Sequence, residues 1–72
     1  MKSRTSCKIT DLSGKQIGFF VNDRGVYKVF SMNNSLLGFW DNTQNKAYDL
    51  TGECISEGVR ALEDFVKKKI SI

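Results

Sequence analysis

The segment Ile9-Thr10-Asp11-Leu12-Ser13-Gly14-Lys15-Gln16-Ile17-Gly18 indicates the fold, because its pattern returns later in the chain. It aligns with Ala47-Tyr48-Asp49-Leu50-Thr51-Gly52-Glu53-Cys54-Ile55-Ser56, and the shared pattern is Asp-Leu-(Ser/Thr)-Gly-x-x-Ile. A second match joins Ile17-Gly18-Phe19-Phe20 to Leu37-Gly38-Phe39-Trp40. The repeating unit is about 20 residues long, occurs two to three times and is too short to bury its own face.

The shared pattern is typical of a β-hairpin. The Asp side chain opens a turn by accepting backbone N–H bonds, and Gly supplies the positive φ that closes it. Together they fit a type I turn with a glycine bulge. Strands are predicted at residues 6–12, 16–22, 26–32, 36–41, 46–50 and 53–56. Short turns between consecutive strands favour an antiparallel meander.

The period changes after the last of these strands. Apolar residues recur at spacings of three and four, which predicts a helix over residues 57–70. Ser56 is the expected N-cap, and Lys67 to Lys69 suit the C-terminal end of the helix dipole. The apolar stripe consists of Val59, Leu62, Phe65, Val66 and Ile70.

The turn chemistry resembles the pattern Tyr-Asp-x-x-Gly-Lys-x-Ile-Gly of small bacterial tandem β-hairpin repeat domains, such as the four-fold β-flower proteins. The likeness covers residues 9–58, and the chain departs from the pattern by lacking a regular fourth copy and by ending in a helix. The resemblance implies an assembly of antiparallel hairpins and brings no catalytic residues with it.

Length and composition agree with one small domain over residues 1–72, with hairpin repeats at 6–56 and the helix at 57–70. The chain has 72 residues, of which 40% are hydrophobic. A core this small is marginal without a staple or a partner. The predicted fold class is α+β, mostly β: an antiparallel meander of five or six strands, strongly bent or barrel-like, with one C-terminal helix packed on it.

Strand parity predicts two apolar sheet faces, although a single helix is available to cover them. Ile17, Phe19 and Val21 share the face expected under the helix, together with Ile9, Leu37, Phe39 and Ile55. The opposite face carries Gly18, Phe20, Phe30, Gly38, Trp40 and Tyr48. Three explanations stay open: the sheet curls into a barrel, a second subunit covers this face, or the aromatics form a platform for a ligand or for bases.

The sequence gives little support for catalysis, so we expect no enzyme, no cofactor and no metal. It has no histidine, the commonest general base. Asp11 and Asp49 stand at turn starts, where Asp is structural. Cys7 and Cys54 match no zinc spacing and are expected to be reduced thiols, although a disulfide between them stays open.

The charge distribution leaves two kinds of partner open. The net charge is +3, and residues 1–40 hold six basic and two acidic residues. A basic half attracts acidic protein surfaces or polyanions. We find no secretory apolar run and no membrane span, which favours a cytoplasmic protein.

The leading functional hypothesis is a small non-enzymatic module that acts through protein–protein contacts or self-association, such as an inhibitor or adaptor of bacterial or mobile-element origin. Large aromatics and Arg dominate interface energies. The alternative is a single-stranded nucleic-acid-binding module that uses the same aromatics and the basic first half. The predicted contact face consists of Phe20, Trp40, Phe30 and Tyr48, with Arg24 and Lys28 at its rim.

Overall fold

The computed structural model describes residues 6–70, which form one antiparallel sheet and one helix. All six strands follow one another in the sheet in chain order, β1-β2-β3-β4-β5-β6. The predicted fold class is therefore confirmed, with six strands. Their bounds are β1 Ser6–Thr10, β2 Gln16–Asp23, β3 Val26–Ser31, β4 Leu36–Asp41, β5 Lys46–Asp49 and β6 Cys54–Glu57, followed by α1 Ala61–Ile70.

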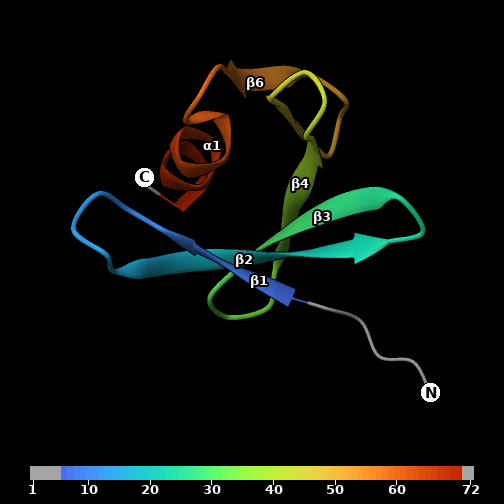
Figure 1. Cartoon of the computed structure of the whole chain (residues 1–72). Coiled ribbons are helices and arrows are strands. Elements are labelled where there is room, and N and C mark those ends of the chain that lie inside the picture. The colour runs from blue at the N-terminus through green and yellow to red at the C-terminus, as the bar shows by residue number, and fades with distance from the viewer. Residues whose placement is uncertain (1–5, 71–72) are drawn as a thin grey trace.

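The sheet is strongly coiled around the helix. In Figure 1, β1, β2 and β3 cross below α1, β4 rises beside it, and β6 closes over the top. Strands β1 and β6 stand at opposite ends of the strand order, so the sheet stays open. Barrel closure, one of the three explanations for the apolar faces, is therefore wrong. Instead α1 fills the concave side and contacts all six strands.

Three turns of the meander share one backbone hydrogen-bond pattern. In the β1–β2 turn, Asp11 N donates to Lys15 O at 2.9 Å and Gly14 N donates to Asp11 O at 3.0 Å. The β5–β6 turn repeats both bonds from Asp49. The β3–β4 turn repeats them from Ser31, with Asn34 adopting a φ of 71° where the other two turns have glycine. The carboxylates of Asp11 and Asp49 also accept backbone N–H bonds from the residues two and four positions further on, which confirms the predicted role of Asp at the start of the turn.

Each of these turns is followed by a β-bulge that inserts one residue. Ile9 pairs with Gly18 and Thr10 with Gln16, so Ile17 is the extra residue. By the same register, Leu37 is the extra residue of β4 and Ile55 that of β6. A bulge re-aims side chains locally. In a regular strand, consecutive residues face opposite sides of the sheet. The bulges explain why Ile17, Leu37 and Ile55 contribute to the core although the residue after each of them also faces the helix.

The sheet face under the helix combines residues of both predicted faces. Four of the residues expected there lie in or against the core cluster, as predicted: Ile9, Ile17, Leu37 and Ile55. A Cβ built on Gly18 would lie 3.5 Å from Val66 Cγ1, and one built on Gly38 would lie 2.7 Å from Phe65 Cζ. These two glycines are therefore under α1, whereas Phe19 points to the other side. The prediction that Phe19, Val21 and Phe39 lie under the helix is wrong, because simple alternation ignores the bulges. The buried core cluster consists of Ile9, Ile17, Val29, Ala47, Phe65 and Val66.

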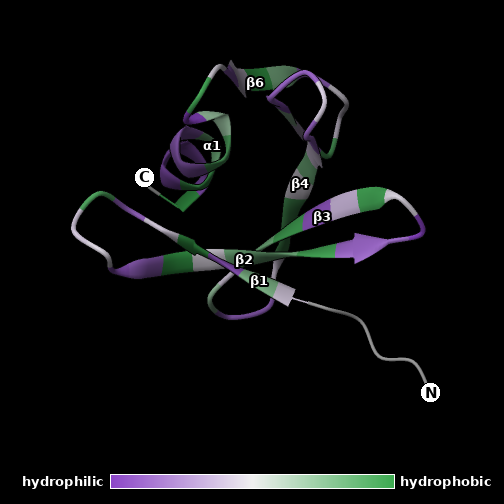
Figure 2. Cartoon of the chain, in the orientation of Figure 1, coloured by the Kyte–Doolittle hydropathy of each residue, from purple (hydrophilic) through white to green (hydrophobic). Residues whose placement is uncertain are grey.

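The helix begins at Ala61 rather than at residue 57. Ser56 is not its N-cap: it lies in β6, pairs with Ala47, and its Oγ donates to the carbonyl oxygen of Ala61 at 2.5 Å. Gly58, with a φ of 109°, separates strand from helix. Val59 therefore falls outside the helix and is 95% exposed. In Figure 2 the outward side of α1 is largely hydrophilic, whereas β4 and β6 carry hydrophobic residues.

Acid should reduce the stability of the β5–β6 turn. The Thr51 hydroxyl donates to Asp49 Oδ1 at 2.6 Å, and this bond is the main reason why the pKa of Asp49 lies below its ordinary value of 3.8. Because its pKa is lower in the folded state, the ionised Asp49 carboxylate stabilises the fold at pH values above its ordinary pKa. This contribution to the free energy of unfolding is lost as the pH falls through the folded-state pKa.

We therefore expect Asp49→Asn to lower the urea midpoint at neutral pH, because the amide accepts these bonds less strongly than the carboxylate. The difference from the wild type should vanish at an acid pH below the folded-state pKa of Asp49, where the wild-type carboxylate is also neutral. Thr51→Ala should show the same convergence. Urea titrations at both pH values check this, and a constant difference between the midpoints would contradict it.

Candidate binding surfaces

The outer face is the side of the sheet away from α1. Register places its residues in two rows, since directly paired residues share a face. One row runs through Lys8, Phe19, Phe30 and Leu36. The longer row crosses all six strands and contains Ser6, Val21, Lys28, Phe39, Tyr48 and Cys54.

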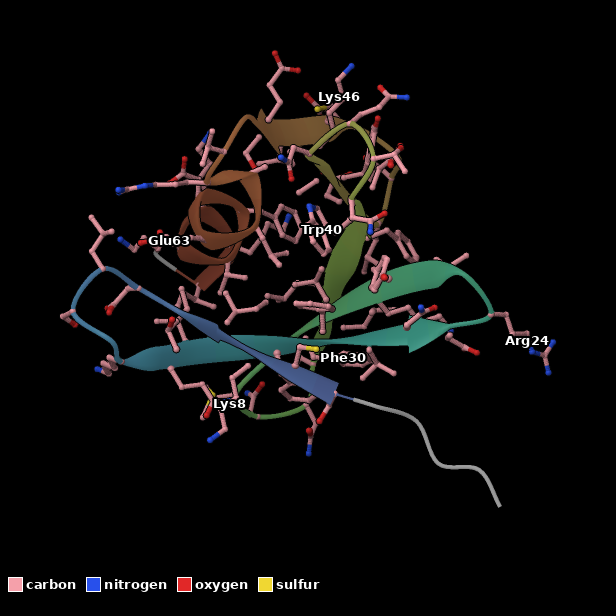
Figure 3. All side chains as sticks on the ribbon, in the orientation of Figure 1. Lys8, Arg24, Phe30, Trp40, Lys46 and Glu63 are labelled. Carbon is pink, nitrogen blue, oxygen red and sulfur yellow. The ribbon has the colours of Figure 1, made fainter. Side chains whose placement is uncertain are left out.

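Aromatic and aliphatic groups form the centre of the outer face. The rings of Phe19 and Phe30 stack with centroids 5.2 Å apart and planes inclined by only 10°. Both residues are half-buried, and Leu36 beside them is exposed. Figure 3 shows Phe30 and Lys8 below the sheet, on the side away from the helix. The described chain places no other element over this side of β1, β2 and β3.

Basic groups flank this apolar centre. Lys8 pairs directly with Phe19 across β1 and β2 and is exposed. Lys28 Nζ lies 2.9 Å from Asp23 Oδ2, so that lysine is held in place beside the stacked rings. Arg24 is at the exposed tip of the β2–β3 turn, as Figure 3 shows, with a φ of 58°.

The second surface is a hollow on the helix side of the sheet, which we call the aromatic pocket. Three of its walls are rings: Phe20 is 5.1 Å from Trp40 and 5.4 Å from Tyr27, and Tyr27 is 5.2 Å from Trp40, measured between centroids. The planes are inclined to one another by 57° to 76°. The pocket has a volume of about 330 Å³ and is lined by Cys7, Phe20, Asn22, Tyr27, Trp40 and Asn42.

Two of the residues that line the aromatic pocket carry side-chain N–H groups, Trp40 and Asn22. Trp40 Nε1 is buried and has no hydrogen-bond partner among the described residues. Asn22 Oδ1 accepts a bond from Gly25 N at 2.9 Å. The Asn22 side chain keeps a second lone pair on this oxygen and two N–H donors for further bonds.

The six predicted contact residues do not share one face. Phe30, Tyr48 and Lys28 lie on the outer face, whereas Phe20 and Trp40 belong to the aromatic pocket. Arg24 stands at the turn between the two surfaces. Sequence reasoning missed Phe19 and Tyr27. Tyr27 could have been found, since a tight turn at Arg24-Gly25 pairs Asn22 with Tyr27 and so aligns it with Phe20.

The two cysteines are free and exposed. Cys7 pairs with Phe20 and lines the aromatic pocket, whereas Cys54 pairs with Tyr48 on the outer face. They therefore lie on opposite faces of the sheet, and no disulfide joins them in this structure.

No family model, curated protein or solved structure matches this chain. The one helix of residues 6–70 has ten residues, too few to cross a bilayer.

Proposed function

We propose that this protein is a small non-enzymatic binding module that contacts a partner protein through the outer face. The observation that carries the proposal is the stacked pair Phe19–Phe30 beside exposed Leu36, on a sheet face that no element of the described chain covers. Contiguous apolar patches with a polar rim mark interaction sites on small soluble domains.

The charges around the patch favour an acidic partner over a second copy of the chain. Lys8 is an exposed cation beside the stacked rings, Lys28 is paired with Asp23, and the chain carries a net charge of +3. Two copies meeting through this face would bring like charges together, whereas acidic side chains around an apolar centre would complement it. An inhibitor or adaptor that docks on an acidic protein surface fits this chemistry.

Selection from a random-peptide display library on the immobilised protein tests the proposal. We expect the enriched peptides to carry aromatic or aliphatic residues next to Asp or Glu. Phe30→Ala should weaken their binding by about thirtyfold or more, as for a central interface aromatic. Leu50→Ala is the matched control, because Leu50 is an apolar residue, 60% exposed, in the β5–β6 turn. Peptides that bind the wild type and Phe30→Ala equally would refute the outer face as the site.

Nucleic acid is the other candidate, since stacked aromatics beside lysines also suit bases and phosphates. Fluorescence anisotropy with a thymidine oligonucleotide separates the two. For the protein-binding proposal we expect no binding that depends on Phe30. Binding that is lost in Phe30→Ala, and whose logarithmic salt slope is about −0.7 per phosphate contact, would replace it with the nucleic-acid reading.

A further inference from the structure

Strand β1 is an open edge of the sheet. It stands at one end of the strand order and pairs on one side only, with β2. Four of its five residues are exposed, and only Ile9 is buried. Within residues 6–70, no side chain forms a hydrogen bond with the backbone of this strand. The unpaired main-chain groups of such an edge are a template for a further strand.

The opposite edge, β6, is covered by the helix. Lys68 Nζ donates to the carbonyl oxygen of Ile55 at 3.2 Å, and Ser56 Oγ donates to the carbonyl oxygen of Ala61. These bonds attach both ends of α1 to β6, and α1 packs against this strand more extensively than against any other. An incoming strand would have to displace these contacts at β6. The described chain makes no corresponding bond to the backbone of β1.

The free main-chain groups of β1 follow from the turn beside it. Asp11 N donates to Lys15 O, so the amide of Asp11 points toward β2. Main-chain groups alternate in direction along a strand, so those of Ile9 also point toward β2. The N–H and C=O groups of Lys8 and Thr10 therefore point to the open side. An added strand would pair with these two residues.

The side chains of β1 favour a segment of alternating chemistry. Lys8 is exposed on the outer face, so an acidic residue in the added strand would complement it. Cys7 is exposed on the helix side, where it pairs with Phe20 and lines the aromatic pocket. An apolar residue beside Cys7 would extend this apolar side of the sheet. Because successive side chains of a strand face opposite sides, apolar and acidic residues should alternate in the added segment.

Charge favours a partner protein over a second copy of this chain. The first ten residues of the sequence include three basic residues and no acidic residue. Two β1 strands paired with each other would bring these like charges together, whereas an acidic strand would be attracted. We propose that β1 binds an extended segment of a partner protein, with alternating apolar and acidic residues, as a seventh strand of the sheet. This contact uses the sheet edge and does not rest on the stacked rings of the outer face.

Amide hydrogen exchange of the whole chain, followed by nuclear magnetic resonance, tests this directly. The probe is a short capped peptide in which Val and Glu alternate, and its matched control has Lys in place of every Glu. We expect the acidic peptide to bind with a midpoint of about 0.1–2 mM, since a flexible peptide must be ordered on binding. At saturation it should slow the exchange of the Lys8 and Thr10 amides by about tenfold or more. The Ile9 amide, which already points toward β2, is the internal control and should change little.

Two substitutions of Lys8 separate charge from main-chain pairing. Lys8→Gln removes the charge but keeps the backbone N–H, so it should weaken binding of the acidic peptide about threefold. Lys8→Pro removes the charge and the N–H, and it should weaken binding at least about tenfold further, because a peptide carbonyl loses its donor. Proline is tolerated on an edge strand where the N–H faces outward, so the sheet should remain folded. Exchange of the Thr10 amide reports binding in both variants.

Three results would overturn the proposal. The first is unchanged exchange of the Lys8 and Thr10 amides up to about 20 mM acidic peptide, far above the expected midpoint. The second is equal binding of the peptide that contains Lys. The third is slower exchange on raising the protein concentration alone, which would identify a second copy as the occupant.

Phe30→Ala separates this contact from the outer face. Phe30 is in β3, two strands away from the edge, so its loss should leave the slowed exchange at Thr10 intact. If the acidic peptide no longer bound this variant, it would sit on the outer face, and the edge proposal would be refuted. The outer-face proposal is judged by whether its own selected peptides depend on Phe30, so each proposal can fail without the other.

Discussion

Gly38→Ala should unfold the protein or lower its free energy of unfolding by about 3 kcal/mol or more, the upper end of the cost of overpacking. A Cβ at this position would overlap the carbonyl oxygen of Tyr48 and lie 2.7 Å from Phe65 Cζ. The first neighbour is backbone of the paired strand β5, and the second is a fully buried ring of α1. Neither can move without separating the strands or lifting the helix from the sheet.

Gly52→Ala is the matched control. Gly52 has a φ of 92°, but a Cβ there meets no heavy atom within 4 Å. Its cost is backbone strain alone, about 1 kcal/mol. Urea titration followed by Trp40 fluorescence compares the two variants. If Gly38→Ala were as stable as Gly52→Ala, the helix could not lie as close to β4 as the structure places it.

Phe65→Ala should lower the free energy of unfolding by about 3–5 kcal/mol, because it leaves a cavity between the helix and the coiled sheet. Phe65 is fully buried in the core cluster and lies over Gly38, where the sheet curves around α1. A 72-residue domain has a total stability of roughly 4–11 kcal/mol, so this single change consumes much of it. The same urea titration measures the loss.

Two comparisons make the Phe65 result specific. Val59→Ala, at a residue 95% exposed before the helix, should change stability by less than about 0.5 kcal/mol. Phe65→Leu should retain part of the stability, since it refills some of the volume. A Phe65→Ala variant as stable as Val59→Ala would mean that Phe65 of α1 does not pack in the core on the concave side of the sheet.

The strands and their turns could be predicted from the sequence because their signals are local. Asp11 and Asp49 accept bonds from residues two and four positions further on, and Gly14 and Gly52 take the positive φ that closes each turn. The β3–β4 turn makes the same backbone bonds from Ser31 and Asn34, whose residue types hide the likeness. Turn chemistry is fixed within five residues, so no knowledge of the tertiary fold was needed.

The covered face could not be predicted in the same way. Simple alternation puts Ile17 and Phe19 together, but the bulge at Ile17 lets that residue and Gly18 both turn toward the helix. A shift of one residue exchanges the two faces of a strand. The bulge is a property of the pairing between β1 and β2, and the residues of β2 alone do not reveal it.

The candidate surfaces were only partly predictable for the same reason. Aromatic residues were expected on a second apolar face, yet Phe20 and Trp40 lie in the aromatic pocket and Phe30 lies on the outer face. The sequence indicated that these aromatic residues form a surface. Their distribution over two different surfaces depends on the register between the strands, which the sequence does not show. One apolar face is covered by α1, and no other element of the described chain covers the opposite face.

Two neighbouring residues of β3 report on the division of the sheet into a face covered by α1 and an open outer face. Val29 is fully buried toward the helix, while Phe30 lies on the outer face. In a chain with Cys7→Ser and Cys54→Ser, we would measure the alkylation rates of Val29→Cys and Phe30→Cys at low protein concentration. Phe30→Cys should react at least on the order of a hundredfold faster, because a thiol at position 29 is reached only by unfolding. Equal rates, or a protected thiol at position 30, would show that the outer face is not open.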